Sequence, residues 1–184
     1  MNIRVAIGIA CLASASLASA QYAGPADIVI SNGGDVTAQV IQWTGSPGDL
    51  DDFYYIDGSS SLFIGANSDW ENNTPPVDLG TIPAGNEVEL GFFNTDTDTW
   101  FYTGPGDRNP DGDIHALVTD LGNGDVRVDF EDLAANQGSD FNYGDGSLLI
   151  TGVHSEPASS VPGPAALGVF ATSGLAMLRR RNKS

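Results

Sequence analysis

Short apolar runs of strand length recur along the middle of the chain, and turn-forming residues separate them. The runs lie at 28–30, 36–43, 53–56, 61–64, 88–93 and 100–102, and the gaps between them hold Gly, Pro, Asn and Asp. A spacing of about ten residues per strand, without a sustained helical period, is typical of two packed antiparallel sheets. The pattern therefore predicts an all-β domain over residues 21–154, an antiparallel β-sandwich that is jelly-roll-like.

The clearest hairpin is predicted over residues 114–132, around the turn 122–125, which reads Gly-Asn-Gly-Asp. Asn-Gly at the centre favours a two-residue type I′ loop. The resulting register turns three facing pairs toward the core: Leu121 with Val126, Thr119 with Val128, and Leu117 with Phe130. It turns four charged residues toward water: Asp120, Arg127, Asp129 and Glu131. At the open end of the hairpin, His115 would lie opposite Asp132 and bond to it.

Two acid-rich loops leave this open end and should be neighbours in space. Hard oxygen donors at alternate positions around a glycine are what Ca²⁺ selects. Residues 107–114 match the first eight positions of an EF-hand loop, but the twelfth position is Val118 and the flanks are strands, so an EF-hand is rejected. The alternative is that these residues only form turns, for which Asp, Asn and Gly also serve. We expect a calcium site with ligands drawn from Asp107, Asn109, Asp111, Asp113, Glu131, Asp132, Asp140 and Asn142.

The charge distribution supports a cation as the partner. The chain has 184 residues, with 7 Lys and Arg against 24 Asp and Glu, for a formal charge of −17. Between residues 21 and 160 only Arg108 and Arg127 oppose all 24 carboxylates, so this segment carries −22. Nucleic-acid binding is excluded because it needs clustered basic residues. Anionic membrane surfaces are poor partners for the same reason.

Residues 1–20 are typical of a secretory signal peptide. A basic start at Arg4 precedes an apolar stretch, and Ala18 and Ala20 form an A-x-A cleavage site, so the mature chain is expected to begin at Gln21. Cys11 lies in the removed segment, and the mature protein would therefore fold without disulfides. A bound metal could take their place in stabilising the fold.

The C-terminus carries a second signal after a predicted linker at 155–160. Val161, Pro162, Gly163 and Pro164 precede an uncharged apolar run over 165–178, and Arg179, Arg180 and Arg181 follow it. This order resembles the PEP-CTERM sorting signal of Gram-negative bacteria, with Gly163 where the family usually has Glu. The resemblance implies an exosortase-type processing enzyme, transient inner-membrane insertion through 165–178, and release or transfer at the cell surface. A plain transmembrane anchor is the alternative.

A second resemblance covers about residues 77–154. The segments 101–105, 109–115, 128–133 and 139–145 are similar to an uncharacterised β domain of exported bacterial proteins, often found beside PEP-CTERM tails or calcium-binding repeats. Its hallmark is a Phe-Glu-Asp strand end, an Asp/Asn-rich loop and a closing strand, here 147–153. The family more often has Asn-Asp directly, so two residues are inserted before Asp145, and Asp145 is left out of the expected ligands. The resemblance implies an extracellular location and calcium, but no reaction.

The sequence offers little support for an enzyme. It lacks the nucleophile-elbow, phosphate-loop and zinc-protease motifs, and no pair of its many carboxylates stands out as that of a hydrolase. A glycan or exopolysaccharide-binding module is the stronger alternative, with Trp70 as the expected contact because polar residues surround it. We predict an exported cell-surface or extracellular-matrix protein without catalytic activity, acidic and calcium-binding.

Overall fold

The computed structural model describes residues 21–22, 26–41, 50–72 and 74–158, and within them the chain is almost entirely β-structure. All strand pairs are antiparallel, and they form three sheets. A six-stranded sheet has the order β1 (Gln21–Tyr22), β9 (Ala116–Gly122), β10 (Asp125–Phe130), β11 (Gly146–Thr151), β3 (Gly34–Ile41) and β6 (Val77–Ile82). A four-stranded sheet has the order β5 (Ser60–Ala66), β4 (Asp51–Asp57), β7 (Glu89–Asn94) and β8 (Thr99–Tyr102). A third sheet pairs β12 (Val153–Pro157) with β2 (Asp27–Ser31).

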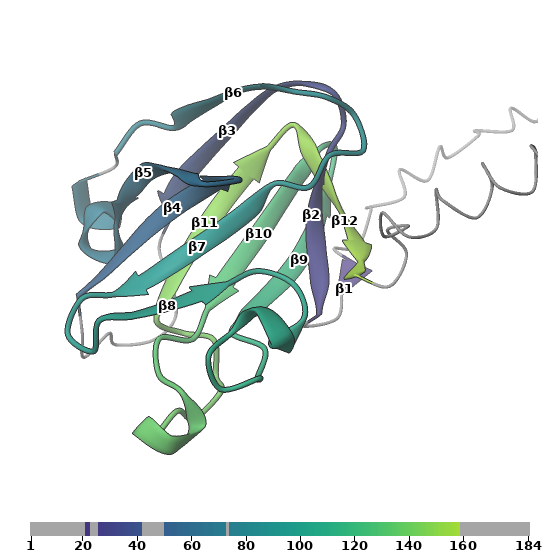
Figure 1. The fold of residues 1–184 in the computed structure, drawn as a ribbon. Coiled ribbons are helices and arrows are strands. Elements are labelled where there is room, and N and C mark those ends of the chain that lie inside the picture. Colours follow the sequence, from purple (N-terminus) through teal and green to yellow (C-terminus); the bar gives the residue numbers. More distant parts are fainter. Residues whose placement is uncertain (1–20, 23–25, 42–49, 73, 159–184) are drawn as a thin grey trace, which may run out of the picture.

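The six-stranded and four-stranded sheets face each other across one hydrophobic core, a sandwich-like arrangement in which the four-stranded sheet forms the front layer in Figure 1. Alternate residues of β3 and β10 are buried, as the two-residue period of a strand requires. Phe53, Phe92 and Phe130 are fully buried and meet in this core, with ring centroids 4.9–5.9 Å apart. This aromatic group joins β4 and β7 of one layer to the end of β10 in the other.

The all-β prediction is confirmed, as is the antiparallel arrangement of its sheets. β6 was not predicted, because it is flanked by prolines and interrupted by Gly80, where the ladder shifts register. The closing strand was expected to run through to 153, but Gly152 at φ +90° ends β11, and β12 then pairs with β2 as far as Pro157. Residues 155–157 are thus strand, although we expected a linker there.

The hairpin turn is as predicted, but its register is not. Asn123 and Gly124 form the loop with φ of 57° and 88°, and Asp125 faces Gly122. The ladder then shifts, so that Val126 faces Asp120 and Val128 faces Val118. The extra residue in the first strand is a β-bulge, and Gly122 beside it takes φ +79°.

The bulge exchanges the two faces of β9. Ala116 and Val118 are fully buried, whereas Leu121 is 38% exposed, so Leu117, Thr119 and Leu121 do not form the core face that the sequence predicted. At the open end, His115 lies opposite Glu131 rather than Asp132, and the Glu131 amide donates to the His115 carbonyl over 3.0 Å. The expected His115–Asp132 pair is therefore wrong.

The two predicted signals at the chain ends, 1–20 and 161–184, lie outside the described residues, and with them the apolar run 165–178. Among the described residues, no helix has the length and apolar character needed to cross a membrane.

Candidate metal site

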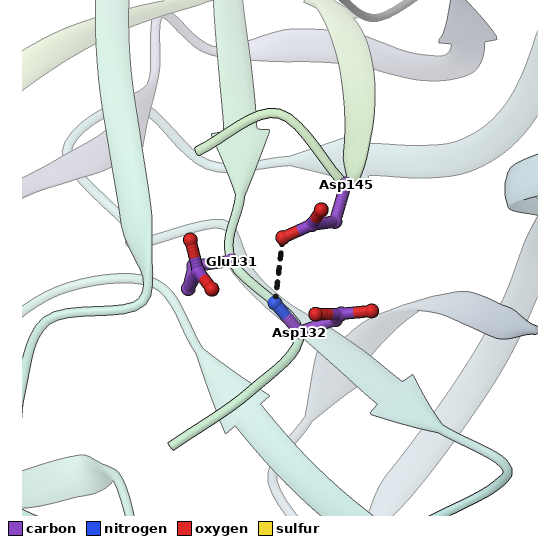
Figure 2. Close-up of side chains that lie close together, drawn as sticks. All are labelled: Glu131, Asp132 and Asp145. Atoms are coloured by element: carbon purple, nitrogen blue, oxygen red, sulfur yellow. Dashed lines mark hydrogen bonds between the residues drawn. The ribbon is translucent and has the colours of Figure 1, made fainter. Parts of the chain in front are cut away.

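Three carboxylates gather where β10 ends and β11 begins. Glu131 and Asp132 follow the last residue of β10, and Asp145 precedes the first residue of β11, so the pairing of these two strands closes the intervening loop. One oxygen from each side chain lies within 4.8 Å of the other two. Figure 2 shows the three side chains around the bend after β10. This acidic cluster, Glu131, Asp132 and Asp145, is the candidate site.

Glu131 is the most deeply buried member, with 2% of its surface exposed. The sequence alternation predicted that it would face water, but β10 ends at Phe130 and the loop 139–143 covers the side chain. Ser139 and the Tyr143 amide lie near this carboxyl group and act to lower its pKa. Its Oε2 atom nevertheless has no hydrogen-bond partner within the described parts of the chain. A buried carboxylate oxygen without a hydrogen-bond partner indicates a position where an ion or a water molecule binds.

The environment of Glu131 disfavours its charge. Burial raises the pKa of the carboxyl group, and the neighbouring charges of Asp145 and Asp140 raise it further. Ser139 and Tyr143 act in the opposite direction without cancelling the rise. A cation at the cluster would favour the ionised form.

The other two members are held by the main chain. The Asp132 amide donates to Asp145 Oδ2 over 3.2 Å, the dashed line in Figure 2. The Asp145 amide donates to the Phe130 carbonyl over 3.1 Å, and the buried Asn94 side chain donates to the Asp132 carbonyl over 3.1 Å. These contacts fix the backbone at both ends of the loop, so the carboxylates approach each other from a rigid frame.

Asp111, the centre of the first predicted loop, engages His115 instead of the acidic cluster. His115 is fully buried and stacks on Phe101 with centroids 3.9 Å apart. Its Nδ1 lies 3.1 Å from the Glu131 carbonyl and its Nε2 lies 3.0 Å from Asp111 Oδ2. The imidazole thus lies between a main-chain carbonyl and a carboxylate.

The net effect on Asp111 is a lowered pKa. Burial acts to raise it, but the hydrogen bond from the Asp113 amide and the hydrogen bond and charge of His115 together outweigh burial. The group acts as a structural anion for the buried imidazole. This role also explains why loop 107–113 lies against the second loop, since the Ala135 amide contacts Asp111 Oδ2 at 3.4 Å.

The remaining expected ligands do not reach the cluster. Asn109 is buried, but its side chain accepts from the Tyr102 amide and donates to the Asp113 carbonyl, both over 2.8 Å. Asp107 and Asp113 are exposed. Asp140 and Asn142 are exposed and bond to each other, with Asn142 Nδ2 donating to Asp140 Oδ2 over 2.7 Å. Of the eight residues expected, the structure brings only Glu131 and Asp132 together.

Asp145 was left out of the expected ligands, and the structure places it in the cluster. The signal that could have found it lies in the strands: if β10 and β11 pair directly, the residues that flank the loop must meet.

The expected glycan contact, Trp70, lies in the 3-10 helix Asn67–Asn72, and its side chain is outside the described part of the chain. Phe53 and Phe101, aromatic residues of the four-stranded sheet, are buried with no exposed surface. Tyr54, Trp100 and Tyr102 are only partly buried and lie on the opposite side of the same sheet.

These features define the protein as an all-β domain of antiparallel sheets with an acidic cluster at one end. No protein-family model, curated protein or solved structure matches the chain.

Proposed function

We propose that the chain is an exported cell-surface or matrix protein, without catalytic activity, whose jelly-roll-like sandwich binds Ca²⁺ through Glu131, Asp132 and Asp145. The observation that carries the calcium proposal is the buried Oε2 of Glu131, which has no hydrogen-bond partner in the described chain and belongs to a cluster of three carboxylates.

Electrostatics favour an ion at this position. Ionised carboxylate oxygens within 4.8 Å of one another repel by roughly 3 kcal/mol per pair at an effective dielectric constant of about 20. Two of the three residues, Glu131 and Asp132, are almost fully buried, so solvent screens them poorly. A divalent cation converts this repulsion into attraction.

The chemistry of the donors favours Ca²⁺. All three side chains offer hard oxygen atoms, whereas Zn²⁺ sites usually include nitrogen or sulfur ligands. Ca²⁺ takes about 6–8 oxygens in flexible geometry, so water or main-chain oxygens would complete the set. Because the ligands flank one loop, the ion would tie the end of β10 to the start of β11. It would thereby cross-link two segments of the fold, as a disulfide does, in a chain that we expect to have no cysteine after export.

Export and sorting rest on the two chain ends. The signal-like segment 1–20 and the PEP-CTERM-like segment 161–184 support secretion across the inner membrane and handling by an exosortase-type enzyme. Intact-mass measurement of the protein recovered from its natural host tests this directly. We expect a chain that begins at Gln21 and ends near residue 160, and a mass that includes 165–178 would favour a retained anchor.

The calcium site is tested by thermal unfolding of the protein with excess Ca²⁺ and with EDTA. Ligand at a hundredfold excess over Kd stabilises the folded state by about 2.7 kcal/mol, so we expect Tm to rise by several degrees. Glu131→Gln keeps the shape of the side chain but removes its charge, and it should abolish the rise. Asp113→Asn, which removes one exposed acid from the neighbouring loop, is the matched control and should keep it.

Glu131→Gln should fold, because it removes a charge that burial penalises. Its Tm in EDTA, compared with that of the unsubstituted protein, reports this directly. An unsubstituted protein that melts identically in Ca²⁺ and EDTA, or a Glu131→Gln variant with an undiminished calcium shift, would contradict the proposal.

A further inference from the structure

The outer face of the four-stranded sheet carries a row of aromatic side chains that crosses all four strands. It consists of Phe63 on β5, Tyr54 on β4, Phe93 on β7, and Trp100 and Tyr102 on β8, and these five residues are called the aromatic stripe. The rings form a continuous series. Tyr54 lies 5.5 Å from Phe63 and 4.9 Å from Trp100, and Trp100 lies 4.9 Å from Phe93 and 6.0 Å from Tyr102.

The stripe is separate from the core. Phe53, Phe92 and Phe101 on the same three strands are fully buried against the other sheet, and the strand alternation turns Tyr54, Phe93 and Trp100 outward. Phe63 is 49% exposed, and the other four rings of the stripe are partly exposed. The four-stranded sheet is the front layer of the molecule in Figure 1, and the stripe lies on the face of this sheet that is turned away from the core.

Gly91 shapes the middle of the stripe. It lies between Tyr54 and Tyr102 in the ladder, where a side chain would interrupt the row. A Cβ atom there would come within 3.1 Å of both Trp100 Cζ3 and Ile56 Cδ1. The absence of a side chain lets the Trp100 indole lie over the strand and reach Tyr54, so the rings form a low platform.

Polar acceptors border the platform. The Tyr54 hydroxyl donates to Asp52 Oδ2 over 3.4 Å. Burial raises the pKa of Tyr102, and the charge of nearby Glu89 raises it further. Apolar rings edged by a few oriented polar groups are typical of sites for ligands that are part apolar and part hydrogen-bonding. The C–H face of a sugar ring can stack on the aromatic rings while its hydroxyls donate to the carboxylates.

Charge narrows the choice of partner. A second copy of a domain with a formal charge of −22 over residues 21–160 would bring Asp52 and Glu89 against like charges. Anionic polysaccharides meet the same repulsion, whereas a neutral polyol does not. The sheet has three inter-strand spacings of about 4.8 Å, so the stripe spans roughly 14 Å, which suits several sugar units rather than one.

We propose that the aromatic stripe binds a neutral polysaccharide chain, with Trp100 and Tyr54 as the central stacking residues and Phe63 as an exposed end. This binding does not depend on the calcium site, which is at the end of β10 in the other sheet.

The test is affinity electrophoresis of the protein in gels that contain a neutral β-glucan, a neutral α-glucan, a galactomannan or anionic alginate. We expect at least one neutral polymer to retard the protein and alginate to leave it unretarded. Trp100→Ala and Phe63→Ser should each weaken the retardation at least tenfold. Leu121→Ala, which removes an exposed apolar side chain from the other sheet, is the matched control and should bind normally.

Phe63 is half exposed, so Phe63→Ser should leave Tm nearly unchanged. A loss of retardation in this variant can then not be ascribed to misfolding. The proposal would be overturned if none of the neutral polymers retarded the protein. It would also be overturned if Trp100→Ala and Phe63→Ser were retarded as strongly as the unsubstituted protein. So would sedimentation equilibrium showing a dimer that Phe63→Ser converts to monomer, since the stripe would then be a self-association surface. All measurements are made both in Ca²⁺ and in EDTA. Retardation that persists in EDTA would show that polysaccharide binding does not require the proposed calcium site.

Discussion

Two acidic side chains at the open end of the hairpin show how burial and partners decide the state of a carboxyl group. Burial acts to raise the pKa of both. For Asp111 the hydrogen bonds from Asp113 and His115 prevail and lower the pKa, whereas for Glu131 the nearby charges of Asp145 and Asp140 add to burial and raise it. The proposed cation site therefore lies at Glu131, where the charged groups that shift its pKa in the described chain are all acidic, and not at Asp111, which contacts the His115 ring.

If Glu131 ligates Ca²⁺ as proposed, its raised pKa would make calcium binding dependent on pH. In EDTA its contribution to stability should decline as pH rises from its unfolded pKa of about 4.3 through the raised folded value, since ionisation is then penalised only in the folded state. Ca²⁺ should relieve this penalty. We expect the calcium-induced rise in Tm to be small at pH 4.5 and to grow toward pH 7, as measured by calorimetry. A calcium shift that is equal at both values would contradict ligation by Glu131.

The lowered pKa of Asp111 has the opposite sign. Its stabilising contribution should be complete above about pH 4 and should be lost as pH falls through the folded pKa, because protonation removes the anion beside His115. The substitution Asp111→Asn should therefore reduce the free energy of unfolding by about 1–3 kcal/mol at pH 7. Urea unfolding of both proteins at pH 7 and at a series of lower pH values would measure it, and a loss that does not shrink as pH falls would contradict a stabilising role of the Asp111 anion.

At the scale of elements, the β9–β10 hairpin determines which residues enter the core. Its turn is set locally by Asn123 and Gly124, both with positive φ. The bulge beside the turn then shifts β9 by one residue, which exchanges its inner and outer faces. The same shift brings His115 opposite Glu131 and so affects the geometry at the far end of the hairpin.

The two registers predict different mutational effects. In the observed register Val118 is fully buried and Leu117 is only partly buried. We expect Val118→Ala to lower the free energy of unfolding by about 2 kcal/mol and Leu117→Ala by less than about 1 kcal/mol. Urea denaturation of the two variants compares them directly. The reverse order of costs would favour the register without the bulge.

At the scale of the whole molecule, the charge of residues 21–160 is distributed over both layers with little internal compensation. Both arginines of this segment are already in ion pairs, Arg108 with Glu87 and Arg127 with Asp129. Among the other described carboxylates, Asp51 is fully buried and accepts a hydrogen bond from the Asn67 side chain, whereas Asp57, Asp96 and Asp125 lie in or beside turns. Self-repulsion of this kind destabilises the compact state, and mobile ions screen it.

Salt should therefore stabilise the domain even without calcium. With EDTA present, we expect Tm to rise between 0.05 M and 0.5 M NaCl, since the Debye length shortens over that range. Glu131→Gln should respond to NaCl like the unsubstituted protein, because screening does not depend on one site. A Tm that does not change with NaCl would show that the surface charges contribute little to the stability.

The candidate site was only partly predictable from the sequence, because its three residues are brought together by the pairing of β10 with β11. The sequence indicated that two acid-rich loops meet, and Asp111 and Ala135 do contact each other. It could not show that Asn109 and Asp111 serve as internal hydrogen-bond partners, or that Asp140 and Asn142 bond to each other in solvent. These choices depend on which oxygen atoms the folded backbone approaches.

The sequence by itself determined the all-β class, the antiparallel hairpin with its Asn123-Gly124 loop, and the strongly acidic character of the domain. These follow from local period, turn chemistry and composition, which act over a few residues. Only the tertiary structure decided the bulged register, the burial of Glu131, its meeting with Asp145 and the alignment of five aromatic rings across four strands. Each of these depends on contacts between segments far apart in the chain, and a shift of one residue changes which side chains meet.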